Sequence, residues 1–101
     1  MIKHIVFWRL NENAYGNDKQ TNTQLLKDKL LAMKDKIDGL ITIEVGFDFS
    51  SEKDSSEVVL YSEFSSKEAL HQYQIHPDHQ EIKKWLGEVR YERRVVDYEI
   101  S

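Results

Sequence analysis

The segment Tyr73–His79 concentrates side chains that can move protons near neutral pH. It holds one tyrosine, two of the four histidines and the only proline of this 101-residue chain. Imidazole titrates near neutrality and a phenol donates a hydrogen bond while neutral, so the two groups suit a general base and an oxyanion donor. The segment also fits an ordinary helix start, with Pro77 at the first helical position.

Composition indicates one small globular domain, residues 1–101. Hydrophobic residues make up 40% and charged residues 32% of the chain, and no apolar run is long enough for a signal peptide or membrane span, so we expect a cytoplasmic protein. The chain has no cysteine, which excludes disulfides and thiolate chemistry. Its net charge of -4 offers no field for nucleic acid. Small molecules or protein partners are therefore expected.

The periodicity of apolar residues predicts four strands and two helical regions in the order βαββαβ. The strands are expected at residues 2–10, 40–49, 57–64 and 93–100, with a polar loop at 11–20. A stripe of leucine, methionine and isoleucine at helical spacing predicts the first helix at residues 22–38.

Two pairs of residues have the spacing of capping boxes. Thr21 with Gln24 predicts the start of the first helix, and Ser65 with Glu68 predicts the start of the second. The second helix must falter at the residue before Pro77, because that residue avoids helical angles.

Two glycines mark further expected irregularities. A third, short helix should run from Pro77 to about Gly87, since glycine commonly follows the last turn of a helix. Gly46, within the second strand, indicates a bulge or a close approach of two backbones.

This order with antiparallel pairing predicts a ferredoxin-like α+β sandwich, whose four-stranded antiparallel sheet carries the helices on one face. The other face is bare and too apolar for a stable monomer. We therefore expect a homodimer packed sheet against sheet as a dimeric α+β barrel. The residues of this face are Ile5, Phe7, Val59 and Tyr61, with Val96 and Tyr98 in addition.

Three segments carry a resemblance to a known family, namely Lys3-His4-Ile5-Val6, Tyr73 through His79, and Arg94-Val95-Val96-Asp97-Tyr98. From end to end the chain resembles the stress-responsive dimeric A/B barrel (Dabb) family. The resemblance implies a homodimer and a fold that cofactor-free enzymes acting on polyketides and aromatic compounds also use. It implies no particular reaction, because most members have no assigned activity.

A plant polyketide cyclase of this family uses histidine and tyrosine without a metal or organic cofactor. Carried over by position, the resemblance implies that His79 is the general base and that Asp97 orients it. Tyr73 then matches the tyrosine six residues before the base, and His4 matches the histidine on the first strand. We expect Tyr73 to hydrogen-bond the developing oxyanion and His4 to position the substrate.

Other positions depart from the cyclase. Val58 replaces a histidine on the third strand, Leu30 replaces a tyrosine on the first helix, and Arg93 stands where the cyclase has an apolar residue. Together with Trp8 and Leu60, these residues are expected to bind the substrate. Arg93 either holds an anionic group of the substrate or pairs with the nearby carboxylate.

Two functions remain open. The first is a cofactor-free pocket that binds a small carbonyl or aromatic molecule and supports proton transfer, as in a cyclase or an isomerase. The second is a stress-associated structural homodimer without enzymatic activity, in which a bond between His79 and Asp97 only fastens helix to sheet. No metal is expected, because His76 and His79 have no third ligand nearby except Asp78, and no heme or flavin motif is present.

Overall fold

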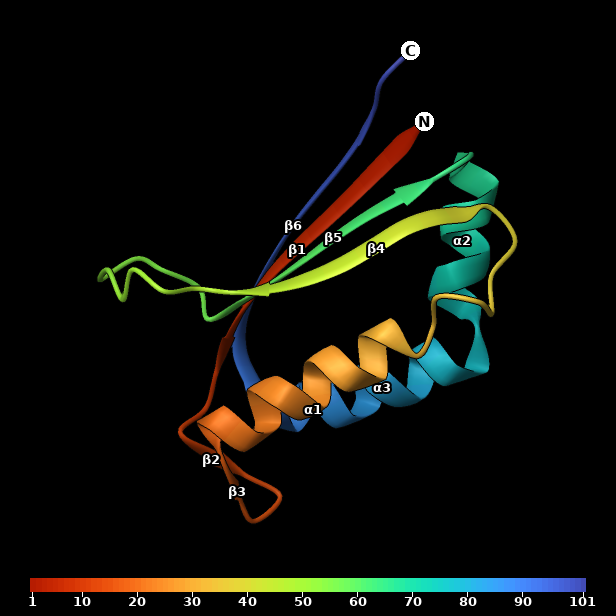
Figure 1. The fold of residues 1–101 in the computed structure, drawn as a ribbon. Helices are drawn as coiled ribbons and strands as arrows, with labels where there is room; N and C mark the ends of the chain where they lie inside the picture. The colour runs from red at the N-terminus through yellow and green to blue at the C-terminus, as the bar shows by residue number, and fades with distance from the viewer.

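The computed structural model describes residues 1–101. Its main sheet has four antiparallel strands in the order β4-β5-β1-β6, and the three helices lie together on one side of it (Figure 1). The predicted sandwich of one helical layer on one sheet is confirmed, and none of the helices is long and apolar enough to cross a membrane. The elements are β1 (Ile2–Leu10), α1 (Lys19–Leu31), β4 (Leu40–Phe47), β5 (Val58–Phe64), α2 (Lys67–Ile75), α3 (Pro77–Val89) and β6 (Arg90–Glu99).

The strands alternate between two faces as their sequences predict. On the helix-covered face, Val6 pairs with Leu60, and both are 1% exposed. Their neighbours point to the open face, where Phe7 is 37% exposed and Val96 is 52% exposed. The open face, which consists of Ile5, Phe7, Val59, Tyr61, Val96 and Tyr98, therefore leaves apolar surface uncovered.

A short hairpin lies in the segment predicted as a polar loop. It pairs β2 (Asn13–Ala14) with β3 (Asn17–Asp18). Its turn has positive φ at Tyr15 and Gly16, 53° and 75°. Two consecutive positive φ angles match a turn whose twist suits paired strands, but tyrosine seldom adopts one, so residue preferences do not predict this turn.

The hairpin shifts the start of α1. Asp18, at its end, is the N-cap and accepts a hydrogen bond from the Thr21 N–H at 2.8 Å. The prediction that Thr21 caps the helix is therefore wrong, as is the predicted end at residue 38. Beyond Leu31 the chain continues as turns that still bury Met33 and Ile37, 1% and 8% exposed, so the predicted apolar stripe reaches the core without a continuous helix.

The second predicted strand, β4, has an irregular register, but not at Gly46. The register of β4 against β5 shifts between Leu40 and Thr42, which leaves Ile41 unpaired and half exposed. Gly46 is instead a close approach, because a Cβ added there would lie 3.2 Å from Val59 Cγ1. No bulge lies at this glycine, and its close neighbour is a side chain rather than a second backbone.

The break between α2 and α3 falls where the proline predicts it. His76 has a ψ of 136°, ends α2 and caps α3, and Pro77 is the first residue of α3. Two details differ from prediction. The N-cap of α2 is Ser66, whose side chain accepts from the Ala69 N–H at 3.1 Å, and α3 continues past Gly87 to Val89.

Candidate functional site

A cavity of about 480 Å³ lies between the helix-covered face of the sheet and helices α2 and α3. We call it the His–Tyr pocket. β1, β5 and β6 contribute the sheet side, while α1, α2 and α3 contribute the opposite wall. Three of the four residues implied as catalytic line it together with most of those expected to bind substrate, namely His4, Tyr73, His79, Trp8, Leu30, Leu60 and Arg93.

The helix break sets the position of His79. His76 Nδ1 accepts a hydrogen bond from the Asp78 N–H at 3.0 Å, and this bond caps α3 directly after the proline. His79 thus lies in the first turn of a new helix, with its ring centroid 4.5 Å from that of Tyr73. No group of three or more histidine, aspartate and glutamate side chains is arranged to hold a metal ion.

Tyr73 has its ring near those of two of the three histidines that line the pocket, His4 and His79. Its ring centroid is 6.3 Å from that of His4. The side chain is fully buried, yet its hydroxyl has no hydrogen-bond partner in the protein. Burial raises the pKa of Tyr73, so the phenol stays neutral and can donate one hydrogen bond into the cavity.

His79 has the properties of a neutral base. Its Nδ1 is buried without a partner. Burial lowers the pKa of His79, and the charges of His4, Lys83 and Arg93 lower it further, against the opposing effect of the Gln74 carbonyl. A neutral imidazole with an unengaged nitrogen is the form that can accept a proton.

Asp97 bonds to His4 rather than to His79. The two residues are directly opposite in the β1·β6 register, and the His4 Nδ1–H donates to Asp97 Oδ1. The expected bond between Asp97 and His79 is therefore wrong. Asp97 is 42% exposed and lies outside the lining of the pocket, whereas the imidazole it holds is 3% exposed and lines it. Because this bond fixes the His4 tautomer, Asp97 acts on the pocket only through His4.

The expected substrate-binding residues divide between the pocket and the core. Trp8, Leu30 and Leu60 line the pocket, and the buried Trp8 Nε1–H has no partner. Val58, which is 1% exposed, belongs to the core and does not line the pocket. Arg93 is exposed, lines the mouth opposite Trp8 in the register and makes no ion pair with Asp97.

Two cations of the lining escape sequence reasoning. Lys83 is four residues after His79 on α3, and residues at this spacing share one helix face, so this signal was present in the sequence. Arg90 is the first residue of β6, three residues before the predicted start of that strand. Sequence alone does not assign it to a strand face, because α3 continues past the expected end at Gly87 and β6 begins directly after it.

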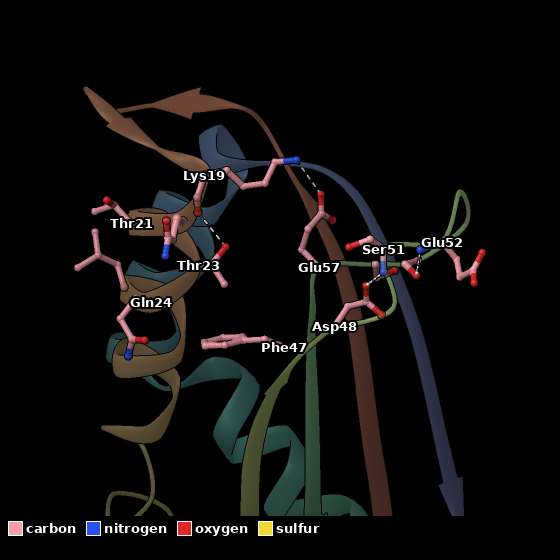
Figure 2. A pocket seen from close by; sticks show the side chains of 13 residues that line it. Lys19, Thr21, Thr23, Gln24, Phe47, Asp48, Ser51, Glu52 and Glu57 are labelled. Carbon is pink, nitrogen blue, oxygen red and sulfur yellow. Dashed lines mark hydrogen bonds and ion pairs between the residues drawn. The ribbon is translucent and has the colours of Figure 1, made fainter.

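A larger, more open hollow of about 1010 Å³ lies between the start of α1 and the β4–β5 loop (Figure 2). Its polar side chains largely satisfy one another. Thr23 donates to the Lys19 carbonyl at 2.8 Å, and Asp48 accepts from the Ser51 N–H at 2.8 Å. Lys27 lies over the Phe47 ring at 5.2 Å. Of the residues that line this hollow, only Glu57 has a buried polar atom without a partner, its Oε2, whereas three residues of the His–Tyr pocket have one.

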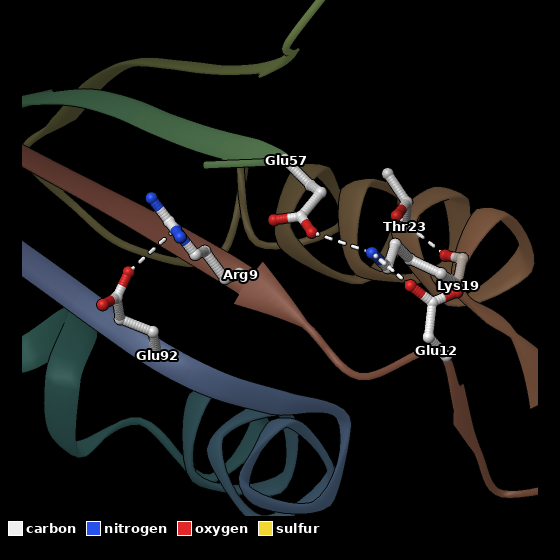
Figure 3. A network of polar contacts seen from close by, with 6 residues as sticks. All are labelled: Arg9, Glu12, Lys19, Thr23, Glu57 and Glu92. Atoms are coloured by element: carbon white, nitrogen blue, oxygen red, sulfur yellow. Dashed lines mark hydrogen bonds and ion pairs between the residues drawn. The ribbon is translucent and has the colours of Figure 1, made fainter. Parts of the chain in front are cut away.

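Ion pairs reinforce the same end of the molecule (Figure 3). Lys19 Nζ lies 3.0 Å from carboxylate oxygens of both Glu12 and Glu57, and these hydrogen bonds raise the pKa of Lys19. Arg9 pairs with Glu92 at 3.0 Å across β1 and β6. These ion pairs thus connect α1 to the segments next to β1 and β5, and β1 to β6. They leave none of these charged groups free to bind a ligand.

Solved structures share this fold over nearly the whole chain. A dimeric protein of unknown function from Bacteroides fragilis has 31% sequence identity and a TM-score of 0.85, with 98% of this chain and 95% of that chain covered. A dimeric ferredoxin-like protein from Thermobifida fusca has 21% identity and a TM-score of 0.78, covering 98% and 90%. Hydroxynitrile lyase from Passiflora edulis has 17% identity and a TM-score of 0.82, covering 99% and 93%.

A comparison with curated proteins found no match. The family profile described as the stress responsive A/B barrel domain matches residues 2–100. The predicted ferredoxin-like fold and the resemblance are confirmed, and the relatives described above as dimeric support homodimer formation. The chain belongs to the stress-responsive A/B barrel (Dabb) domain family.

Proposed function

We propose that residues 1–101 form one Dabb domain with a cofactor-free pocket that binds a small carbonyl or aromatic compound and transfers a proton. One observation carries this proposal. Three residues that line a single cavity, Trp8, Tyr73 and His79, each carry a buried polar atom without a partner, namely Nε1, Oη and Nδ1. Buried polar groups are nearly always hydrogen-bonded, so atoms left free around one space favour a bound molecule with polar groups of its own.

The proposed reaction begins at a carbon next to a carbonyl. His79 Nδ1 takes a proton from this carbon, and the electron pair of the C–H bond moves to the carbonyl oxygen. Tyr73 donates its hydrogen bond to the resulting enolate oxygen, which stabilises the developing charge. His4, held by Asp97, positions the substrate from the sheet side.

The Passiflora relative supports the proposal in one respect. It is a hydroxynitrile lyase, so this fold accommodates an enzyme. At 17% identity, the likeness carries no residue role to this chain.

Replacing Tyr73 with phenylalanine tests the proposed oxyanion donor. Wild-type protein should speed the exchange of the α-protons of 2-tetralone in D2O, measured by NMR, beyond an equal concentration of free imidazole. Tyr73→Phe should slow this exchange roughly 100-fold, as expected for loss of one oxyanion donor. The free energy of unfolding should not fall, because the lost hydroxyl has no partner in the fold. Equal exchange rates for wild type and Tyr73→Phe would contradict the role, and a wild type no faster than imidazole would favour the structural homodimer.

We propose that the open face forms the homodimer interface. Ile5, Phe7, Val59 and Tyr61 lie on adjacent strands β1 and β5, so they form one continuous apolar surface. Charged pairs flank it, with Lys3 near Glu63 at one end and Arg9 near Glu92 at the other. An apolar centre with a charged rim is typical of an interface between like subunits.

Phe7→Asp should convert the dimer to a monomer. Light scattering should report about 24 kDa for wild type, twice the 12.0 kDa of one chain, and about 12 kDa for the variant. Phe7 is 37% exposed in the single chain, so the charge is tolerated there but becomes buried and unpaired between two sheets. Val95→Asp, on the helix-covered face and 42% exposed, is the matched control and should remain dimeric. A Phe7→Asp dimer would place the interface elsewhere.

A further inference from the structure

All the charged side chains at the mouth of the His–Tyr pocket are basic. Lys83 of α3 and Arg90 and Arg93 of β6 line it, and no aspartate or glutamate does. The chain as a whole has a net charge of -4, so this local excess of positive charge runs against its composition. A cavity lined by one sign of charge gathers ions of the opposite sign.

These three cations have no ion-pair partner within the protein. Other basic residues of the chain do, such as Arg94, which lies 3.6 Å from Glu92 on the open face. The ion pairs of the structure include none formed by Lys83, Arg90 or Arg93. Their donors are therefore available to a molecule that enters the pocket.

Two of these cations also act electrostatically on His79, a residue of the pocket lining. The charges of Lys83 and Arg93 are among the causes that lower the pKa of His79. Arg93 is directly opposite Trp8 in the β1·β6 register, and both residues line the pocket. An anion bound between these groups would relieve the mutual repulsion of the cations and leave its apolar part against the indole.

We infer that the ligand of the His–Tyr pocket carries an acid group, which Arg93, Arg90 and Lys83 bind at the mouth while its apolar body reaches Tyr73 and His79. This inference rests on the proposed function and names its substrate class, an aromatic or carbonyl compound with a carboxylate or phosphate. The guanidinium fork suits both anions, because it presents parallel N–H donors to two oxygens.

Three probes that share one ring system test the inference. The binding of 2-naphthoic acid, 2-naphthyl phosphate and neutral 2-naphthamide should be measured by calorimetry at low and high salt. At least one acid should bind about tenfold more tightly than the amide, a difference expected for a charge-assisted hydrogen bond. Added salt should weaken the binding of the acid and not of the amide. The more tightly bound acid identifies the preferred group.

The matching variants locate the acid group. Arg93→Gln and Lys83→Gln should each reduce the preference for the acid several-fold and leave the affinity for the amide unchanged. Lys84→Gln removes the same charge from the neighbouring exposed position of α3, outside the lining, and should bind like wild type. A preference that persists in both pocket variants overturns the inference.

The remaining outcomes separate this inference from the function on which it rests. Equal affinity of wild type for acid and amide overturns the acid group alone, because a neutral ligand still occupies the proposed pocket. Failure of all three probes to bind, together with no acceleration of 2-tetralone exchange, overturns the acid group and the proposed function together.

Discussion

His79→Ala should slow the exchange of 2-tetralone α-protons about 100- to 10,000-fold, the usual contribution of a positioned general base. The variant removes the only unengaged imidazole nitrogen that is buried in the pocket. The protein should remain folded, since His79 Nδ1 has no hydrogen-bond partner within the chain that the substitution would remove. A change in tryptophan fluorescence, to which Trp8 of the pocket lining contributes, should still report binding of the ketone. An exchange rate within twofold of wild type would remove His79 from the mechanism.

The pH dependence of the wild-type exchange rate is a second test of His79 as the general base. His79 accepts a proton only when neutral, so the exchange rate should rise with pH and then level off. Because burial lowers the pKa of His79 from 6.5, the half-maximal rate should lie below pH 6.5 and neutral pH should lie on the plateau. A rate that still rises between about pH 8 and 10 would assign the base to a group with a higher pKa.

Gly39→Ala should destabilise the fold by roughly 2 to 5 kcal/mol, a large part of the stability of a typical domain. Gly39 has a φ of +88°, and a Cβ there would lie 2.6 Å from Ser65 Oγ and 2.7 Å from Ala69 Cβ. The serine hydroxyl can rotate away, but the Ala69 Cβ is fixed to the backbone of α2. The expected loss thus combines backbone strain with a steric contact that only movement of a helix relieves. Urea unfolding at fixed protein concentration measures it.

Two other glycines separate these contributions. Gly16→Ala has a similar φ of +75° with no atom within 4 Å of the added Cβ, so it should cost only the backbone strain of about 1 kcal/mol. Gly87→Ala lies within α3 with the same open space and should stabilise the helix by about 1 kcal/mol. A Gly39→Ala variant no less stable than Gly16→Ala would show that the contact with α2 is easily relieved.

The alternation of apolar residues predicts the faces of the sheet but not the alignment of its strands. Side chains repeat every two residues, so alternation places Asp97 on the helix-covered face in any register that is shifted by an even number of residues. Only the observed register puts Asp97 opposite His4 and shows that its partner is His4 rather than His79. Alternation likewise cannot tell which residues of a face meet a cavity, so it does not distinguish Val58, which belongs to the core, from the residues that line the pocket.

Residue preferences predict the local structure where a single residue restricts the backbone. They fail where a residue adopts a backbone angle that is unusual for its type. Pro77 forces the break that places His79, and the structure has it at the predicted residue. Tyrosine seldom adopts a positive φ, so the type of residue at Tyr15 does not indicate the turn there. The hairpin, and with it the N-cap at Asp18, is therefore not predictable from residue preferences. The grouping of His4, Tyr73 and His79 around one cavity follows from the family resemblance and agrees with the geometry.

The position of β1 has a consequence for how the chain folds. β1 lies inside the sheet, yet its neighbours β5 and β6 come from the second half of the sequence, and the bond between His4 and Asp97 joins residues 93 apart. Pairings between distant segments form slowly because a long loop must close first. One edge of the first strand therefore stays unpaired until β5 docks, and the other until the last strand, β6, docks. The pocket is complete only at that final step, so binding of a ligand reports that the whole chain has folded.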